Sequence, residues 1–384
     1  MPHVSIQRHL VLAVAVFIPI ALFSPAADAT ADQKELIQQA YEKTKNATSI
    51  ADFDTILQLC AEAHKGGLNS PQESYVKSLI AWAQNRRGEL YTEQASAAQQ
   101  RGEKERAAEL DGKALADFEA AIDLDATRWK PWHNRGVSYA IAGKYQNAIA
   151  DFTKVIELNT NYPNAWFNRG EIYYDVGQLD QALKDYSEAI RLNPKDAGAY
   201  TSRAHTLFRL DRFKEALTDY TKAYELAPDA TTLANRGDAY QSLGQWGKAA
   251  EDFNQALQLD AESPRALQCA AWLLATCPDD LIRNQKYAVE AAEKAVELNG
   301  EPNMRYLDTL AAAYANAGRF DEAVAKVKEA IAYGGTDETP PLKKRLELYQ
   351  QQRPYRQPGN TAASTTAPQS APARATTSAK KKAT

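Results

Sequence analysis

Small and aromatic residues recur through the middle of the chain with a period of about 34 residues. The period is marked by four short segments that begin 34, 34 and 33 residues apart: His133–Gly136, Phe167–Gly170, Thr201–Ala204 and Ala234–Gly237. Three residues after each segment stands an aromatic residue or Leu, and a turn follows. A fixed period of this length predicts an array of stacked units without a single globular core. Such arrays bind other molecules along an extended surface and seldom catalyse reactions.

The unit that begins at Pro163 shows how the pattern predicts two helices. Counted from Pro163 as position 1, positions 4, 8 and 11 share one face of a first helix, and positions 20, 24 and 27 share one face of a second. Gly177 supplies the turn between them, and Pro194 ends the second helix. Small residues at positions 8, 20 and 27 allow close approach, and aromatic residues at 4, 11 and 24 fill the space: Gly170, Ala182, Ala189, Trp166, Tyr173 and Tyr186.

This pattern resembles the tetratricopeptide repeat, because eight spaced positions of the unit agree with that repeat at once. The resemblance implies an all-α fold, a right-handed superhelical solenoid of antiparallel helix pairs with about six to seven repeats. The spacing between Cys277 and Asn284, together with Arg305–Leu310, is similar to a secreted bacterial, planctomycete-like type of tetratricopeptide protein.

The repeat template divides the chain into successive segments. A signal peptide at 1–29 precedes an N-terminal helical cap at 30–80. A stretched repeat at 81–128 is followed by four regular repeats at 129–263 and two divergent repeats at 264–336. A C-terminal capping helix at 337–356 and a disordered tail at 357–384 come last. The caps are expected because a solenoid must cover the apolar faces of its end repeats.

The stretched repeat predicts a protruding hairpin. Tyr91 and Gly102 are 11 residues apart where the template has 4, and Gly102 and Ala114 are 12 apart where it has 5. Each helix has therefore gained about two turns, which predicts a hairpin that projects by about 10 Å. The alternative is a longer hairpin with no task of its own.

An internal comparison predicts ion pairs between the two helices of a repeat. Position 7, usually Leu in this family, is Arg in five repeats, and position 23 is Asp in the same five. Since a half-buried Arg needs a partner and a carboxylate matches its planar fork, we expect a structural Arg–Asp bridge in each, in preference to a ligand site. The five pairs are Arg87 with Asp117, Arg135 with Asp151, Arg169 with Asp185, Arg203 with Asp219, and Arg236 with Asp252.

The family resemblance also implies where a partner binds, because positions 2, 5, 6, 9, 12 and 13 of the first helix line a concave, peptide-holding groove in that family. An amide at position 6 can donate to and accept from a peptide backbone, and exposed aromatic residues offer apolar contacts. The alternative is that the recurring Asn residues are merely tolerated at the surface or bridge adjacent repeats. The candidate partner-binding groove comprises His133, Asn134, Phe167, Asn168, Glu171, Tyr174, His205, Phe208, Arg209, Asn235, Asp238 and Trp272.

The two ends of the chain predict export and a flexible tail. Arg8, the apolar run Leu10–Phe23 and the small residues Ala27 and Ala29 are typical of a secretory signal, with cleavage after Ala29. The mature chain is therefore expected to be periplasmic or secreted, and an uncleaved anchor is the alternative. The tail is rich in Ala, Thr, Ser and Pro, which predicts disorder. Its basic tip could contact an anionic envelope polymer or serve only for solubility: Lys380, Lys381 and Lys382.

Composition excludes several classes of function. The formal net charge of −4 disfavours nucleic-acid binding, and the chain lacks a phosphate loop, GxSxG and HExxH. The five His do not cluster, so neither a metal nor another cofactor is expected. Cys60, Cys269 and Cys277 are an odd set, and packed free thiols are favoured over a disulfide between the last two.

These observations together predict a non-catalytic scaffold of the cell envelope that binds a protein or peptide segment in the groove. Two alternatives remain open at this point. One is a structural envelope component attached through its basic tail, and the other is an accessory subunit that positions a catalytic partner.

Overall fold

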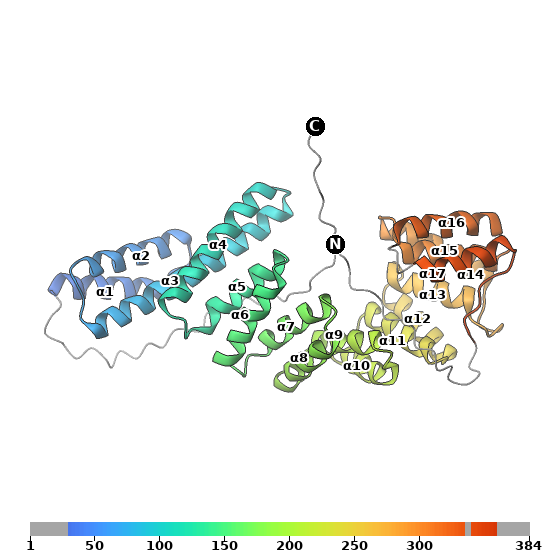
Figure 1. Ribbon diagram of the computed structural model, residues 1–384, viewed down its shortest axis with the longest axis horizontal. Helices are drawn as coiled ribbons and strands as arrows, with labels where there is room; N and C mark the ends of the chain where they lie inside the picture. The colour runs from blue at the N-terminus through green and yellow to red at the C-terminus, as the bar shows by residue number, and fades with distance from the viewer. Residues whose placement is uncertain (1–29, 335–338, 359–384) are drawn as a thin grey trace. The chain divides into compact units, whose positions relative to one another are not determined.

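The computed structural model describes residues 30–334 and 339–358. Within these ranges the chain forms 17 α-helices and no strand, which confirms the predicted all-α array of helix pairs (Figure 1). The predicted signal peptide lies outside the described residues, and so do Lys380, Lys381 and Lys382 of the tail. None of the described helices combines the length and apolar character that a membrane span requires.

The chain separates into two compact units, residues 1–172 and 173–384, and the division falls inside α7 (Pro163–Asp175).

The first unit is built from three antiparallel hairpins, in which α1 pairs with α2, α3 with α4, and α5 with α6. The first three helices each begin with a reciprocal capping box, formed by Thr30, Ser49 and Asn69 with the side chain three residues later. The helices are α1 (Ala31–Thr44), α2 (Ile50–Lys65), α3 (Ser70–Gln100), α4 (Lys104–Leu124), α5 (Trp129–Ile141), α6 (Tyr145–Leu158) and the first part of α7.

Helices α3 and α4 are 31 and 21 residues long, against 13 and 14 residues for α5 and α6. In Figure 1 the α3–α4 hairpin extends past the α5–α6 hairpin. Its outer end has a small core of its own, formed by Ala95, Ala98, Ala107 and Leu110 with Tyr91 packed against them. The seven-residue additions to both helices therefore stay in phase and bury apolar side chains against each other.

The second unit continues the hairpin pattern with shorter helices. The pairs α9–α10, α11–α12, α13–α14 and α15–α16 pack as hairpins, and α17 packs on α16. After the second part of α7, the helices are α8 (Leu179–Leu192), α9 (Ala197–Arg209), α10 (Phe213–Leu226), α11 (Ala230–Ser242), α12 (Trp246–Leu259), α13 (Pro264–Thr276), α14 (Gln285–Asn299), α15 (Met304–Asn316), α16 (Phe320–Tyr333) and α17 (Thr339–Gln350).

Close approach of the paired helices depends on the small residue at position 8. A Cβ atom added to Gly237 on α11 would lie 2.4 Å from the ring of Phe253 on α12, so only glycine fits without movement. The turn between the helices needs a left-handed residue at position 15, where Gly244 has a φ of 67°. In the α9–α10 turn that position is Asp211, with a φ of 58°, a conformation that costs a non-glycine residue free energy.

The described chain continues past α17 to residue 358. Gln357, which the sequence analysis assigns to the disordered tail, donates hydrogen bonds to Thr276 from its backbone and its side chain. The boundary of the predicted tail is therefore wrong at this residue, because the absence of periodicity does not report contacts with a distant helix.

Candidate functional site

The first helix of each repeat presents the side chains that the sequence analysis assigns to a partner. We call the surface formed by positions 2, 5, 6, 9, 12 and 13 of these helices the first-helix face. In the first unit it belongs to α3, α5 and the start of α7, and in the second unit to α9, α11, α13 and α15. The predicted residues fall into three groups. The Arg and Asp residues pair between the two helices of a repeat, some residues of the first-helix face are buried against neighbouring helices, and others are partly open to solvent.

The Arg and Asp residues at positions 7 and 23 lie on the side of the repeat where the two helices meet. Arg135 donates two hydrogen bonds to the carboxylate of Asp151, each 2.8 Å long. The same two-bond geometry joins Arg87 to Asp117, Arg203 to Asp219, and Arg236 to Asp252. In these four pairs the Asp side chains are only 4–7% exposed.

Aromatic rings at position 4 of the same repeats also hold these Arg side chains in place. The guanidinium of Arg135 lies 4.9 Å from the ring centre of Trp132 at position 4, and that of Arg203 lies 5.8 Å from Tyr200 at the same position. The hydrogen bonds that Arg135 donates to Asp151 raise the pKa of the Arg135 guanidinium above its ordinary value. The guanidinium is thus held charged between an aromatic ring and a buried carboxylate, which is a structural arrangement. In the remaining repeat Arg169 donates to Thr153 Oγ1 over 2.9 Å, and Asp185 is buried.

In the first unit, the amides at position 6 link neighbouring repeats. Asn134 Nδ2 on α5 donates to Asn85 Oδ1 and to Glu89 Oε1 on α3, over 3.0 and 3.1 Å. Asn168 Nδ2 lies 3.3 Å from Nε2 of His133, and His133 Nδ1 lies 3.4 Å from Asn134 Oδ1. His133 can therefore accept from one Asn and donate to the other in its neutral form. Burial lowers the pKa of His133 to about 4, which keeps it neutral.

This arrangement corrects the predicted groove in the first unit. Asn168 is 0%, Phe167 3% and His133 7% exposed, so none of the three presents a surface to a partner. Asn134 is half-buried and bonded to the preceding repeat, and Glu171 is half-buried. The amides at position 6 bridge adjacent repeats, which was the alternative to partner binding. A short amide at this position reaches the first helix of the preceding repeat.

The second unit contains a longer polar chain of the same kind. Asn235 Nδ2 on α11 lies 3.0 Å from His205 Nε2 on α9, and Asn235 is 8% exposed. On its other side Arg265 of α13 approaches the Asn235 oxygen, at 3.4 Å, and pairs with the carboxylate of Asp238. Desolvation lowers the pKa of His205 to about 4, and the charge of Arg265 contributes in the same direction.

The chain of contacts then reaches α15. Arg265 donates to Gln268 Oε1 over 2.8 Å, and Gln268 Nε2 donates to Thr309 Oγ1 over 2.8 Å. Polar side chains thus connect α9, α11, α13 and α15 in succession. Asn235 was predicted to contact a partner and is instead an internal link, and Asp238 is engaged by Arg265. Thr309 was not predicted, although it stands at position 6 of its repeat, the position of Asn134, Asn168 and Asn235.

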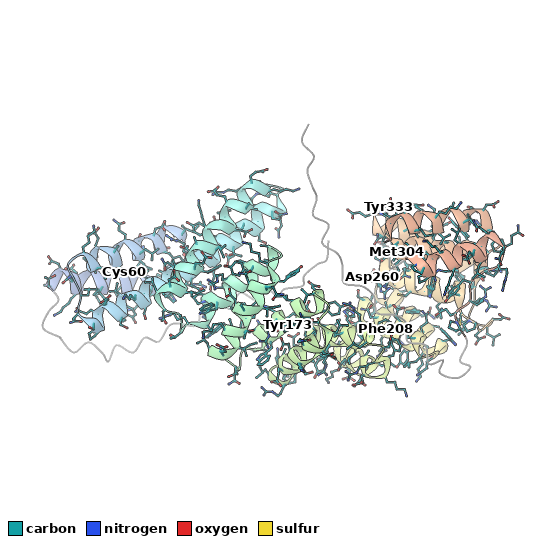
Figure 2. The ribbon with its side chains drawn as sticks, viewed as in Figure 1. Cys60, Tyr173, Phe208, Asp260, Met304 and Tyr333 are labelled. Atoms are coloured by element: carbon teal, nitrogen blue, oxygen red, sulfur yellow. The ribbon has the colours of Figure 1, made fainter. Side chains whose placement is uncertain are left out.

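On α9 the side chains at positions 12 and 13, Phe208 and Arg209, are half-buried and partly open to solvent on the same face. Arg209 lies 4.8 Å from the ring centre of Tyr174 and donates one long hydrogen bond, 3.4 Å, to the Tyr174 carbonyl oxygen. Phe208, labelled in Figure 2, packs edge-on against Phe213 at 5.1 Å and is half-buried. Gln241 at position 12 of α11 is also half-buried, and its side-chain oxygen is itself buried, without a hydrogen-bond partner in the described chain.

Trp272, the last predicted groove residue, is covered by the chain's own C-terminal segment. Its ring centre lies 5.9 Å from that of Tyr355 and 5.4 Å from the guanidinium of Arg345 on α17. Arg345 also donates two 2.7 Å hydrogen bonds to Asp308 on α15. Trp272 is therefore on the predicted face but is not open to a partner in this arrangement.

The described residues offer little to a metal ion or a reactive centre. No group of three or more His, Cys, Asp or Glu side chains within them has the geometry to hold a metal. Cys60, Cys269 and Cys277 are free and buried, and burial raises the pKa of the Cys60 thiol to about 12. The thiols are therefore protonated and act as packed apolar groups at neutral pH.

Family models match the middle of the chain. Models described as tetratricopeptide repeat match residues 163–196 and 195–262, and a model described as TPR repeat matches residues 136–177. The search of curated proteins found no match.

Three solved structures illustrate what the chain is similar to. The chain is 22% identical to MamA from Desulfovibrio magneticus RS-1, with 45% of this chain and 95% of that chain covered and a TM-score of 0.40. It is 22% identical to YrrB, described as a TPR protein with an unusual peptide-binding site, over 46% of this chain and 88% of that one, at a TM-score of 0.39. Yeast Tom70 is 17% identical over 85% of this chain and 66% of its own, at a TM-score of 0.43. The family models and the helical hairpins agree that residues 136–262 form tetratricopeptide repeats.

Proposed function

We propose that this protein is a non-catalytic scaffold that binds an extended segment of a partner protein on the first-helix face of its second unit, at α9 and α11. The repeat fold itself supports a role in protein–protein interaction. The open side chains at positions 12 and 13 support the choice of this part of the face, because the neighbouring amides and His residues are used within the protein.

The proposal rests on the guanidinium of Arg209, which lacks a carboxylate partner in the described chain. Among the described residues it has no carboxylate within ion-pair distance, whereas Arg87, Arg135, Arg203 and Arg236 each have one. A guanidinium has five N–H donors, and this one uses a single long bond. Stacking on Tyr174 fixes its orientation, so its free donors can hold a carboxylate or two backbone carbonyl groups at little further cost in entropy.

The residues beside Arg209 define the chemistry of the partner segment. Phe208 offers part of an aromatic ring beside the guanidinium. A segment that carries an acidic side chain near an apolar one, in an extended conformation, would satisfy both groups. Because no arrangement of nucleophile, base or metal accompanies them, the proposal includes no catalytic step.

We place this scaffold in the cell envelope on the strength of the N-terminal segment. Residues 1–29 have the composition of a cleavable secretory signal. N-terminal sequencing of the protein purified from its natural host should give a first residue at Thr30. A protein that retains its Met1 and fractionates with the cytoplasm would contradict this location.

The binding site is tested by matched charge reversals. Arg209→Glu should abolish capture of a partner from the envelope fraction, while Arg191→Glu should leave it unchanged. Arg191 is an exposed residue on α8 that pairs with Glu188, so the two variants change the chain's charge equally. Circular dichroism must show equal helicity for both. A partner that is retained by both variants, or lost by both, would contradict the assignment of the site.

A deletion separates this proposal from attachment through the basic tail. Removing residues 359–384 eliminates Lys380, Lys381 and Lys382 but keeps every described contact. Binding through the first-helix face predicts that the truncated protein retains its partner. Loss of the partner, or of association with an anionic envelope polymer, would support the tail instead.

A further inference from the structure

The chain beyond α17 turns back onto the first-helix face of the last two repeats. The reversal occurs at Gln352, which has a φ of 54°, and is closed by hydrogen bonds from Gln352 N to Tyr349 O and from Arg353 N to Leu348 O. The segment that follows has no regular secondary structure. It is held by contacts with α13 and α15, at residues 40 or 81 positions earlier in the chain for its hydrogen bonds.

Tyr355 makes the apolar contact of this segment. Its ring is half-buried and packs against Trp272, which occupies position 9 of α13. The guanidinium of Arg345 lies 5.3 Å from the Tyr355 ring centre and 5.4 Å from that of Trp272. One cation thus contacts both rings, and Asp308 neutralises it from the other side.

Arg356 and Gln357 make the polar contacts. Arg356 donates to the Ala275 carbonyl oxygen over 3.1 Å and to Asn316 Oδ1 over 2.9 Å. Gln357 donates from its backbone to the Thr276 carbonyl, 2.8 Å, and from its side chain to the Thr276 hydroxyl, 2.7 Å. Ala275 and Thr276 are the last residues of α13, where carbonyl groups lack helical partners and the helix dipole is negative. This end of the helix therefore favours a cation and an N–H donor.

The contacted residues occupy positions 9, 12 and 13 of their repeats. These are the positions that the family resemblance assigns to a partner, and Arg209 and Phe208 stand at two of them on α9. Tyr355–Gln357 therefore occupies the end of the first-helix face in the manner of an extended ligand. A capping helix needs no such extension, because α17 alone already packs against α16.

The segment also carries a feature that weakens its hold. Arg356 has no carboxylate within ion-pair distance among the described residues. Burial and the neighbouring charge of Arg283 both lower the pKa of Arg356. A partly desolvated cation without a counter-ion costs free energy that the four hydrogen bonds must offset.

We infer that Tyr355–Gln357 is an exchangeable occupant of this site, which a partner segment with an aromatic residue followed by Arg displaces. The inference builds on the proposed function, because the displacing segment belongs to a protein bound on the same face. The tethered segment competes at an effective concentration of about 1 mM, so a partner must bind well enough to overcome it. Competition from Tyr355–Gln357 would restrict binding at the α13–α15 site to partners that also bind beside Arg209.

The test uses the full-length chain and one defined probe, a fluorescent, end-capped peptide of the sequence Gln352–Pro358. The double variant Tyr355→Ala/Arg356→Ala removes the ring contact and the Arg356 hydrogen bonds of the occupant and leaves only those of Gln357, so it should bind this peptide in fluorescence anisotropy. The unaltered protein should bind it at least about tenfold more weakly, because its own segment competes. Arg353→Ala is the matched control, since Arg353 is exposed and makes only a backbone contact, and it should behave like the unaltered protein.

Two results would overturn the inference. One is failure of the double variant to bind the peptide while its helicity is intact, and the other is equal binding by all three proteins. A peptide with Ala at the Tyr355 and Arg356 positions should not bind the double variant, and its binding would also contradict the assigned contacts. Arg209→Glu should not affect peptide binding, so a failure here and a failure of the proposed partner site are distinguishable.

Discussion

Replacing Asp252 with Ala tests whether the Arg–Asp pairs hold the two helices of a repeat together. The Asp252 side chain is 5% exposed and accepts hydrogen bonds of 2.8 and 2.7 Å from Arg236, whose side chain is 15% exposed. Removal of one partner from a buried pair costs about 3–5 kcal/mol. Since Arg236 retains some contact with water and a 3.4 Å bond to Thr221, we expect the lower end, about 3 kcal/mol.

The measurement must be local, because a repeat array does not unfold as one unit. Native-state hydrogen exchange of the amides in α11 and α12 reports the free energy of opening that hairpin. A loss of about 3 kcal/mol corresponds to exchange roughly 100-fold faster in these helices. Helices of the first unit should exchange at unchanged rates.

Glu215→Ala provides the control, because Glu215 pairs with Arg212 at side-chain exposures of 57% and 44%. An exposed pair of this kind contributes about 0–1 kcal/mol. The double variant Arg236→Ala/Asp252→Ala should lose less than the sum of its single variants, since neither charge is left buried alone. Equal exchange in the Asp252→Ala and Glu215→Ala proteins would refute the reasoning.

Three further predictions concern stability. Asp211→Gly should raise the local unfolding free energy by about 0.5–1 kcal/mol in hydrogen exchange, because glycine adopts the positive φ of this turn without strain; a lower value would contradict this. Gly237→Ala should destabilise α11–α12 by about 1–3 kcal/mol through its clash with Phe253, whereas Gly247→Ala, which meets nothing within 4 Å, should be neutral or stabilising in the same assay. His133 is neutral in the fold with a pKa of about 4 against an ordinary 6.5, so its contribution is present above pH 6.5 and lost as the pH falls toward 4. Between pH 7 and 4.5, the free energy of local opening should therefore fall less in His133→Gln than in the unaltered protein, by a difference of about 2 kcal/mol in hydrogen exchange of α5. Parallel pH profiles of the two proteins would contradict the buried neutral state.

The repeat architecture could be predicted from the sequence because packing within a repeat is local. Gly237 and Phe253 are 16 residues apart, and both follow from the spacing of small and aromatic residues on two helices. The Arg–Asp correlation was readable for the same reason, since Arg236 and Asp252 lie in one unit and vary together across units.

Contacts between repeats were harder to predict. Position 6 was assigned to a partner because a single repeat, taken alone, exposes that side chain. In the fold, Asn168 meets His133 and Asn235 meets His205, 35 and 30 residues earlier, so the amides are buried between first helices. His is at position 5 in one case and position 9 in the other, so no constant spacing links the partners in the sequence.

The covering of Trp272 could not be predicted for a different reason. Residues 353–357 carry no helical period, and their contacts with Thr276 lie 81 residues away. Such a contact depends on where the end of α17 points, which is a property of the assembled fold and not of any local pattern.

The central claim is that a partner binds the first-helix face of the second unit beside Arg209, and site-specific photocrosslinking tests it most directly. A benzophenone amino acid at Ser242, exposed at position 13 of α11, should crosslink to a partner from the envelope fraction. The same group at Gln258, exposed on the second helix α12, should not. The Ser242 crosslink should vanish when Arg209→Glu is added. Crosslinking from Gln258 alone, or a Ser242 crosslink that survives Arg209→Glu, would contradict the account.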